Sequence, residues 1–150
     1  MQASPLNNSL PTNTYFLDLL KTVKTIALVG ASSKPHRASY EVMSFLQAHN
    51  FRVIPVNPIL AGQDLLGEKI YAAIADIPIP VDMVDIFRNP EAAGSTCKEV
   101  IELAPEKRPK IIWMQIGVIN HDAAKLAEAS AMTVVMDQCP KRIIQKAAKA

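Results

Sequence analysis

The sequence predicts a doubly wound α/β fold, in which helices cover both faces of a five-stranded parallel sheet. Two observations predict it. Five short apolar runs, each long enough for a buried strand, alternate with segments of helical periodicity. The first run ends at Gly30 and is followed by a polar and basic loop and then a helical pattern, the strand–turn–helix start of a Rossmann-like sheet. Right-handed crossovers favour the strand order 3-2-1-4-5.

The elements follow one another in a regular order. Strands are expected at 25–29, 52–56, 83–87, 110–114 and 133–136, and helices at 14–23, 39–49, 90–103, 121–130 and 141–150. Asn89, followed by Pro90, and Asn120 are expected to cap two of the helices, and Asn50 to end another in the left-handed conformation. Gly and Pro residues between 59 and 80 predict a long loop with a short helical piece near 71–75.

Length and charge narrow the class of protein. The 150 residues are enough for one domain with a single core, expected at 14–150 after a flexible segment at 1–13 that is rich in Asn, Ser, Pro and Gln. Lys and Arg total 16 against 14 Asp and Glu, a net charge of +2 that is too small for a nucleic-acid surface. No apolar run approaches the roughly 20 residues of a membrane span.

The cysteines indicate a reducing compartment. Cys97 and Cys139 are far apart and form no C-x-x-C pair, so the sequence predicts neither a disulfide framework nor a metal site. Few cysteines and no predicted disulfide framework are typical of a cytoplasmic protein.

The loop after the first strand is a candidate phosphate site. Backbone N–H groups at the start of a helix lack intrahelical partners and attract anions, and Gly30 allows a sharp turn close to a ligand. Lys34 and Arg37 add positive charge. Ser32 and Pro35 stand where a full G-x-G-x-x-G fingerprint has glycines, so the loop indicates a nucleotide-type ligand more than NAD itself.

The end of the second strand also argues against NAD. An NAD-binding sheet carries an acidic residue there that holds the ribose hydroxyls. Here the position holds Asn57, and no Asp or Glu occurs between 42 and 63. An uncharged side chain suits a ligand with an additional phosphate at this place.

Five segments of the chain, all at expected strand ends, resemble one known family. They read VGASSKPHRASY, VIPVNP, VDMVDIFR, WMQIGV and VVMDQCP, and the resemblance covers about residues 22 to 140. The sequence is similar to the small stand-alone CoA-binding-domain proteins, which are related to the CoA-binding domain of succinyl-CoA synthetase. The resemblance implies a Rossmann-type fold that binds coenzyme A.

The resemblance also implies a set of ligand-binding residues, transferred by position. Those expected to meet the phosphates are Gly30, Ala31, Ser32, Lys34 and Arg37. Val56, Asn57 and Pro58 would flank the adenosine, Phe87 and Arg88 would close the pyrophosphate side, and Gln115 and Gly117 would border the pantetheine path. His121 stands where the family is expected to have an acidic residue, which argues against a catalytic carboxylate there.

Our hypothesis from the sequence is a protein that binds CoA or an acyl-CoA and acts as a carrier, sensor or regulatory module, without catalytic residues of its own. An NAD(P)-linked oxidoreductase fragment is one alternative, since it shares the strand–glycine–helix start. A protein-interaction module with a vestigial nucleotide site is another. At Cys139 an inert small residue is favoured over a thiol that forms a mixed disulfide with CoA.

Overall fold

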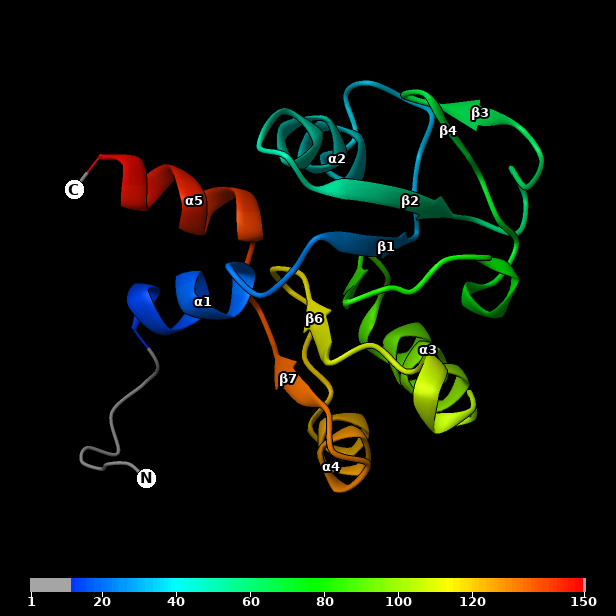
Figure 1. Ribbon diagram of the computed structural model, residues 1–150, viewed down its shortest axis with the longest axis vertical. Coiled ribbons are helices and arrows are strands. Elements are labelled where there is room, and N and C mark those ends of the chain that lie inside the picture. Colours follow the sequence, from blue (N-terminus) through cyan, green and yellow to red (C-terminus); the bar gives the residue numbers. More distant parts are fainter. Residues whose placement is uncertain (1–11, 150) are drawn as a thin grey trace.

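The computed structural model describes residues 12–149, and its centre is a five-stranded parallel sheet (Figure 1). The strands are β1 (Thr25–Val29), β2 (Arg52–Val56), β5 (Met83–Ile86), β6 (Ile111–Met114) and β7 (Thr133–Val135). The helices are α1 (Asn13–Leu20), α2 (Ala38–Ala48), α3 (Pro90–Ile101), α4 (His121–Ala129) and α5 (Pro140–Ala148). The predicted Rossmann-like α/β class is confirmed.

The strand order differs from the expected one and needs a correction. The sheet runs β2-β1-β5-β6-β7, so the third predicted strand lies beside the first and not outside the second. The outer edge of β2 is occupied by Tyr71, whose N–H donates to Pro55 O (3.0 Å) and whose carbonyl accepts from Asn57 N (2.9 Å). Pro55 has no N–H to offer a further strand, which is why proline is confined to edge strands. After β2 the chain returns to the other side of β1 to form β5, so the strand order reverses between β1 and β5, and this is the switch point of the sheet.

The connection from β2 to β5 contains a small hairpin that the sequence analysis missed. Its strands are β3 (Asp64–Leu65) and β4 (Glu68–Lys69). The two turn residues have positive φ, 48° at Leu66 and 85° at Gly67, as a two-residue hairpin loop requires. The expected helical piece is a single 3-10 turn, η1, at Ile74–Asp76.

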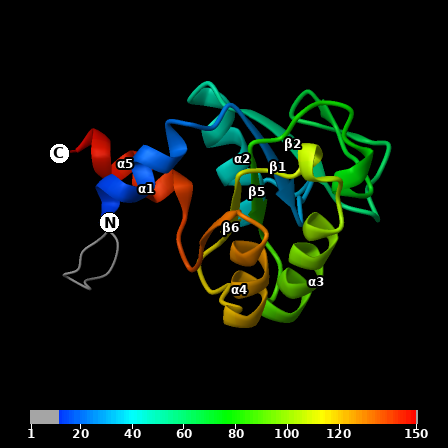
Figure 2. The same ribbon diagram turned by 60° about the horizontal axis from the view of Figure 1, so that its bottom comes forward.

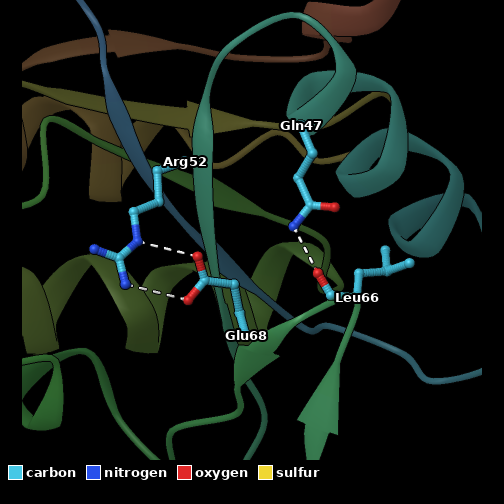
Figure 3. A network of polar contacts seen from close by, with 4 residues as sticks. All are labelled: Gln47, Arg52, Leu66 and Glu68. Atoms are coloured by element: carbon cyan, nitrogen blue, oxygen red, sulfur yellow. Dashed lines mark hydrogen bonds and ion pairs between the residues drawn. The ribbon is translucent and has the colours of Figure 1, made fainter.

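Polar contacts tie this hairpin to β2 and α2 (Figure 3). The Arg52 guanidinium makes a two-point ion pair with the Glu68 carboxylate, at 3.0 Å from Nε and 3.3 Å from Nη2. Gln47 of α2 donates to Leu66 O at 3.1 Å (Figure 3). The hairpin therefore holds the connection against the outer edge of the sheet.

Helices cover the sheet on both sides (Figures 1 and 2). α3 and α4 pack together on one face, over a core that includes Val84, Ile86 and Ile112. α1, α2 and α5 cover the other face, over a core that includes Leu28 and Trp113. The first and last helices lie side by side (Figure 1). No helix within residues 12–149 is long and apolar enough to cross a membrane.

Helix ends agree with the capping residues with one exception. Asn89 Oδ1 accepts from Ala92 N, Asn120 Oδ1 accepts from Ala123 N, and Asn50 has a φ of 71°, all as expected. α1, however, begins earlier than expected, with Thr12 as its N-cap. Of the predicted flexible segment 1–13, residues 12 and 13 therefore belong to this helix start, and residues 1–11 lie outside the described part of the chain.

Candidate functional site

Gly30 joins three strand ends at the switch point. Its φ is +89°, and a Cβ at this position would lie 2.2 Å from Phe87 O, so only glycine fits. The N–H groups of Gly30 and Ala31 both donate to Val56 O, at 3.1 and 3.3 Å. These two N–H groups, expected to meet phosphate, are therefore already bonded to the end of β2.

A hollow of about 270 Å³ opens beside this junction, at the N-terminus of α2. It is lined by Gly30, Ser32, Lys34, Arg37, Ala38, Ser39 and Phe87. The structure thus brings together most of the residues predicted to contact phosphate, along with Phe87 from the neighbouring strand. Because pockets for drug-sized ligands measure about 300–1,000 Å³, this hollow fits one part of such a ligand.

The hollow has the electrostatic character of an anion site. Arg37 is the N-cap of α2 and makes no side-chain capping bond, so no side chain of the cap residue covers the N–H groups of the first turn. The loop itself is folded by its own bonds: Lys34 N donates to Ser32 Oγ (3.1 Å) and Arg37 N to Lys34 O (3.0 Å). The exposed side chains of Lys34 and Arg37 can both reach an anion at this helix start.

Asn57 plays a structural part that the sequence did not reveal. Its Nδ2 donates to Ala31 O at 2.8 Å, and its Oδ1 accepts from Ile59 N at 2.8 Å and from Leu60 N at 3.3 Å. The carboxamide therefore connects the glycine loop with the loop after β2. Ile59, held by this turn, is 87% exposed beside Pro58.

We expect Asn57→Asp to destabilise the protein. Aspartate keeps an acceptor for Ile59 N but cannot donate to the Ala31 carbonyl, and it places two acceptors against each other. The free energy of unfolding at pH 7 should fall by about 1–3 kcal/mol, measured by urea denaturation. The matched control is Asn89→Asp, because that side chain only accepts, from Ala92 N, and aspartate caps a helix as well as asparagine. Equal stability of the two variants would contradict this role of Asn57.

Arg88, expected on the pyrophosphate side, lies beside Gly30 but outside the lining of the hollow. The aliphatic part of the Arg88 side chain lies close to Gly30, since a Cβ added at Gly30 would be 3.2 Å from Arg88 Cγ. Burial raises the pKa of Glu99 on α3, and the positive charge of Arg88 opposes that rise. The guanidinium therefore acts toward α3, on the opposite face of the sheet from α2.

Gln115 and Gly117 lie at the carboxyl end of β6 and do not line the hollow. Gly117 has a φ of 83°, and its N–H donates to Asp137 Oδ1 at 2.7 Å, which joins the ends of β6 and β7. Gln115 is buried, and its N–H continues the sheet ladder to Ile86 O. The predicted pantetheine residues thus border the same edge of the sheet, one strand away from Phe87.

Sequence reasoning missed two residues near the hollow. Ser39, in the first turn of α2, is buried and lines it. Asp85 lies fully buried in the middle of β5, two residues before Phe87. A charged residue inside the apolar run 83–87 was a visible signal for Asp85, whereas nothing in the sequence distinguished Ser39 from an ordinary helix residue.

A larger cavity of about 390 Å³ lies at the opposite edge of the sheet. Its lining includes the apolar segment 77–81 and Leu103, and the charged residues Asp82, Glu106, Lys107, Arg108 and Lys110. Ligands of doubly wound sheets bind at the carboxyl ends of the strands, at the switch point. The hollow beside Gly30 has that position and this cavity does not.

Comparisons with known proteins agree with this fold. The sequence model of the family described as "CoA binding domain" matches residues 24–145. The chain is 33% identical to the uncharacterized protein YneT of Bacillus subtilis over 132 residues, which covers 87% of this chain and 93% of that protein. The crystal structure of Prb, described as PH1109 protein redesigned for binding, superimposes with a TM-score of 0.85 at 31% identity and covers 95% of this chain and 96% of its own.

A more distant relative is an enzyme subunit. The chain is 30% identical over 101 residues to the alpha subunit of acetate–CoA ligase [ADP-forming] I of Pyrococcus furiosus, covering 64% of this chain but 21% of the subunit. The fold is that of a Rossmann-like α/β domain with a candidate site at its switch point. The chain belongs to the CoA-binding domain family.

Proposed function

We propose that this protein binds coenzyme A or an acyl-CoA, with the phosphates at the N-terminus of α2. The observation that carries the proposal is the hollow at the switch point, where Lys34, Arg37 and the first turn of a helix meet. Multiply charged phosphates need cations and helix N–H groups, and this place supplies both. Membership of the CoA-binding domain family and the similarity to an acetate–CoA ligase subunit support the same ligand.

In this proposal the protein is a carrier, sensor or regulatory module that performs no bond-making of its own. The pantetheine arm runs from the hollow toward Gln115 and Gly117. Cys97 and Cys139 are both unpaired and buried, which suits the reducing cytoplasm, the proposed location. Burial of Cys139 supports an inert residue over one that reacts with the CoA thiol.

The binding test compares ligands and one matched pair of variants. Calorimetric titration of the wild type should show saturable binding of CoA, weaker binding of 3′-dephospho-CoA and none of NADPH. Arg37→Ala should weaken CoA binding about 10- to 100-fold, because it removes a charge-assisted contact. Arg142→Ala, an exposed arginine on α5 that does not line the hollow, removes the same charge and should leave the affinity unchanged.

Three outcomes would overturn the proposal. Absence of saturation with CoA at millimolar concentration would exclude CoA as the ligand. Equal loss of affinity in Arg37→Ala and Arg142→Ala would show that the net charge, and not the hollow, attracts the ligand. NADPH binding in place of CoA would favour the oxidoreductase alternative. Against that alternative, Asn57 stands where an NAD-binding sheet has the acidic residue that holds the ribose hydroxyls, and its side chain bonds to Ala31 O and Ile59 N.

A further inference from the structure

Asp85 is a buried carboxyl group without a hydrogen-bond partner. It lies in β5 between Leu28 of β1 and Trp113 of β6, its register partners on either side. Its exposed fraction is 0%, and no donor within the described residues contacts Oδ1 or Oδ2. Buried polar groups are almost always bonded, so such an exception calls for a function.

Gln115 carries a second acceptor of the same kind. Its side chain is 8% exposed, and Oε1 is buried without a donor among residues 12–149. Trp113 is the register partner of Asp85, and Gln115 follows two residues later with its N–H still bonded to Ile86 O. Because side chains alternate along a strand, Asp85 and Gln115 point to the same face as diagonal neighbours on adjacent strands, within reach of long side chains.

One proton on Asp85 would join the two groups by a hydrogen bond and leave only one of the three oxygens without a partner. Three acceptor oxygens without a donor are costly in a buried place, and an ionised carboxylate is the costliest arrangement. Burial raises the pKa of Asp85 well above its ordinary value, which favours the neutral acid. A neutral carboxyl group has an O–H to donate, and Oε1 of Gln115 lacks a donor.

No charged neighbour explains the shift. Tyr40 of α2 and Cys139 at the start of α5 pack against the core on this face. The charged side chains of the covering elements and their end residues lie toward solvent or over an aromatic ring; they are Asp18, Lys21, Arg37, Glu41, Lys141, Arg142, Lys146 and Lys149. The only cause of the raised pKa of Asp85 is its burial.

We propose that Asp85 is a neutral acid that donates its proton to Gln115 Oε1 and so positions the Gln115 amide N–H groups toward a ligand. The ligand group that these N–H groups would bind is an amide carbonyl, as in the pantetheine arm of CoA. This inference rests on the proposed function. Asp85 is a positioning residue, since it acts through Gln115 and has no surface of its own.

The test separates the pantetheine arm from the phosphates. CoA is compared with adenosine 3′,5′-bisphosphate, which lacks the arm, in titrations of the wild type, Asp85→Asn and Asp85→Leu. Asparagine keeps a donor for Gln115, so CoA affinity at pH 7 should be retained. Leucine has no donor, and CoA should bind about tenfold more weakly with unchanged affinity for the bisphosphate.

Gln115→Met provides a second route if Asp85→Leu folds poorly. It should weaken CoA binding about as much as Asp85→Leu, and the double variant should show no further loss. The wild type should also lose CoA affinity at pH values where Asp85 ionises, whereas Asp85→Asn should not. Infrared spectroscopy should show the carbonyl band of a buried carboxylic acid at pH 7, absent in Asp85→Asn.

Three results would overturn the inference. One is an ionised Asp85 at pH 7, because an ionised carboxylate can only accept, and the Gln115 Nε2 would then donate to it. Another is loss of CoA affinity in Asp85→Asn as large as in Asp85→Leu. The third is an equal loss for both ligands, which would indicate general damage to the site. If the wild type binds neither ligand, the proposed function fails and the ligand part of this inference fails with it, while the infrared band still decides the acid–amide pair.

Discussion

Gly30→Ala is expected to destabilise the protein more than a Gly→Ala substitution at any other described glycine outside the helices. The new Cβ would lie 2.2 Å from Phe87 O, which belongs to the backbone of the neighbouring strand end and cannot rotate away. The φ of +89° adds the strain of a left-handed residue, about 1–2 kcal/mol. With the clash included, we expect a loss of about 3 kcal/mol or more in the free energy of unfolding, and loss of CoA binding with it.

Gly62→Ala is the matched control. Gly62 has nearly the same φ, +91°, but a Cβ there meets nothing within 4 Å, so only the backbone strain remains. Urea denaturation of the two variants therefore separates the clash from the strain. If both lose the same stability, the contact between Gly30 and Phe87 does not restrict this position.

Asp85→Asn is expected to stabilise the protein at neutral pH. Burial raises the pKa of Asp85 in the folded state, so above the ordinary value of 3.8 the unfolded chain releases a proton that the folded protein keeps. The folded state then binds more protons, and stability falls as pH rises, by about 1.4 kcal/mol per pH unit, until the folded pKa is reached. Asparagine does not titrate, so this loss is absent in the variant.

The measurement is the free energy of unfolding from pH 3.5 to pH 8. Wild type and Asp85→Asn should be similar at the acid end and diverge above about pH 4. Asp64→Asn, at an exposed aspartate of the β3–β4 hairpin, is the control and should follow the wild type at every pH. A constant difference between wild type and Asp85→Asn over the whole range would show that folding does not raise the pKa of Asp85.

Much of the fold could be predicted because each strand carries its own apolar run. The five central strands and the caps at Asn89 and Asn120 depend on local sequence, and the structure confirms them. The strand order depends on a contact between Tyr71 and β2 that no periodicity reports. Pro55 was the available signal, since it marks β2 as an edge strand.

The candidate site was predictable in outline and less so in detail. Loop composition and family resemblance placed Gly30, Ser32, Lys34 and Arg37 together, and the hollow contains all four. The bonds of Asn57 to Ala31 and Ile59 depend on how two loops meet in space. A sequence shows which polar groups are present, but their partners emerge only from the packed chain.

The pairing of Tyr71 with β2 has a consequence for association between molecules. On that side the sheet offers no continuous row of open N–H and C=O groups, because Tyr71 already uses Pro55 O and Asn57 N. The other edge strand, β7, is three residues long, from Thr133 to Val135. Short edge strands are one of the means by which proteins avoid edge-to-edge pairing of their sheets. Recruitment of a foreign strand would therefore be restricted to β7, where few backbone bonds are available to hold it.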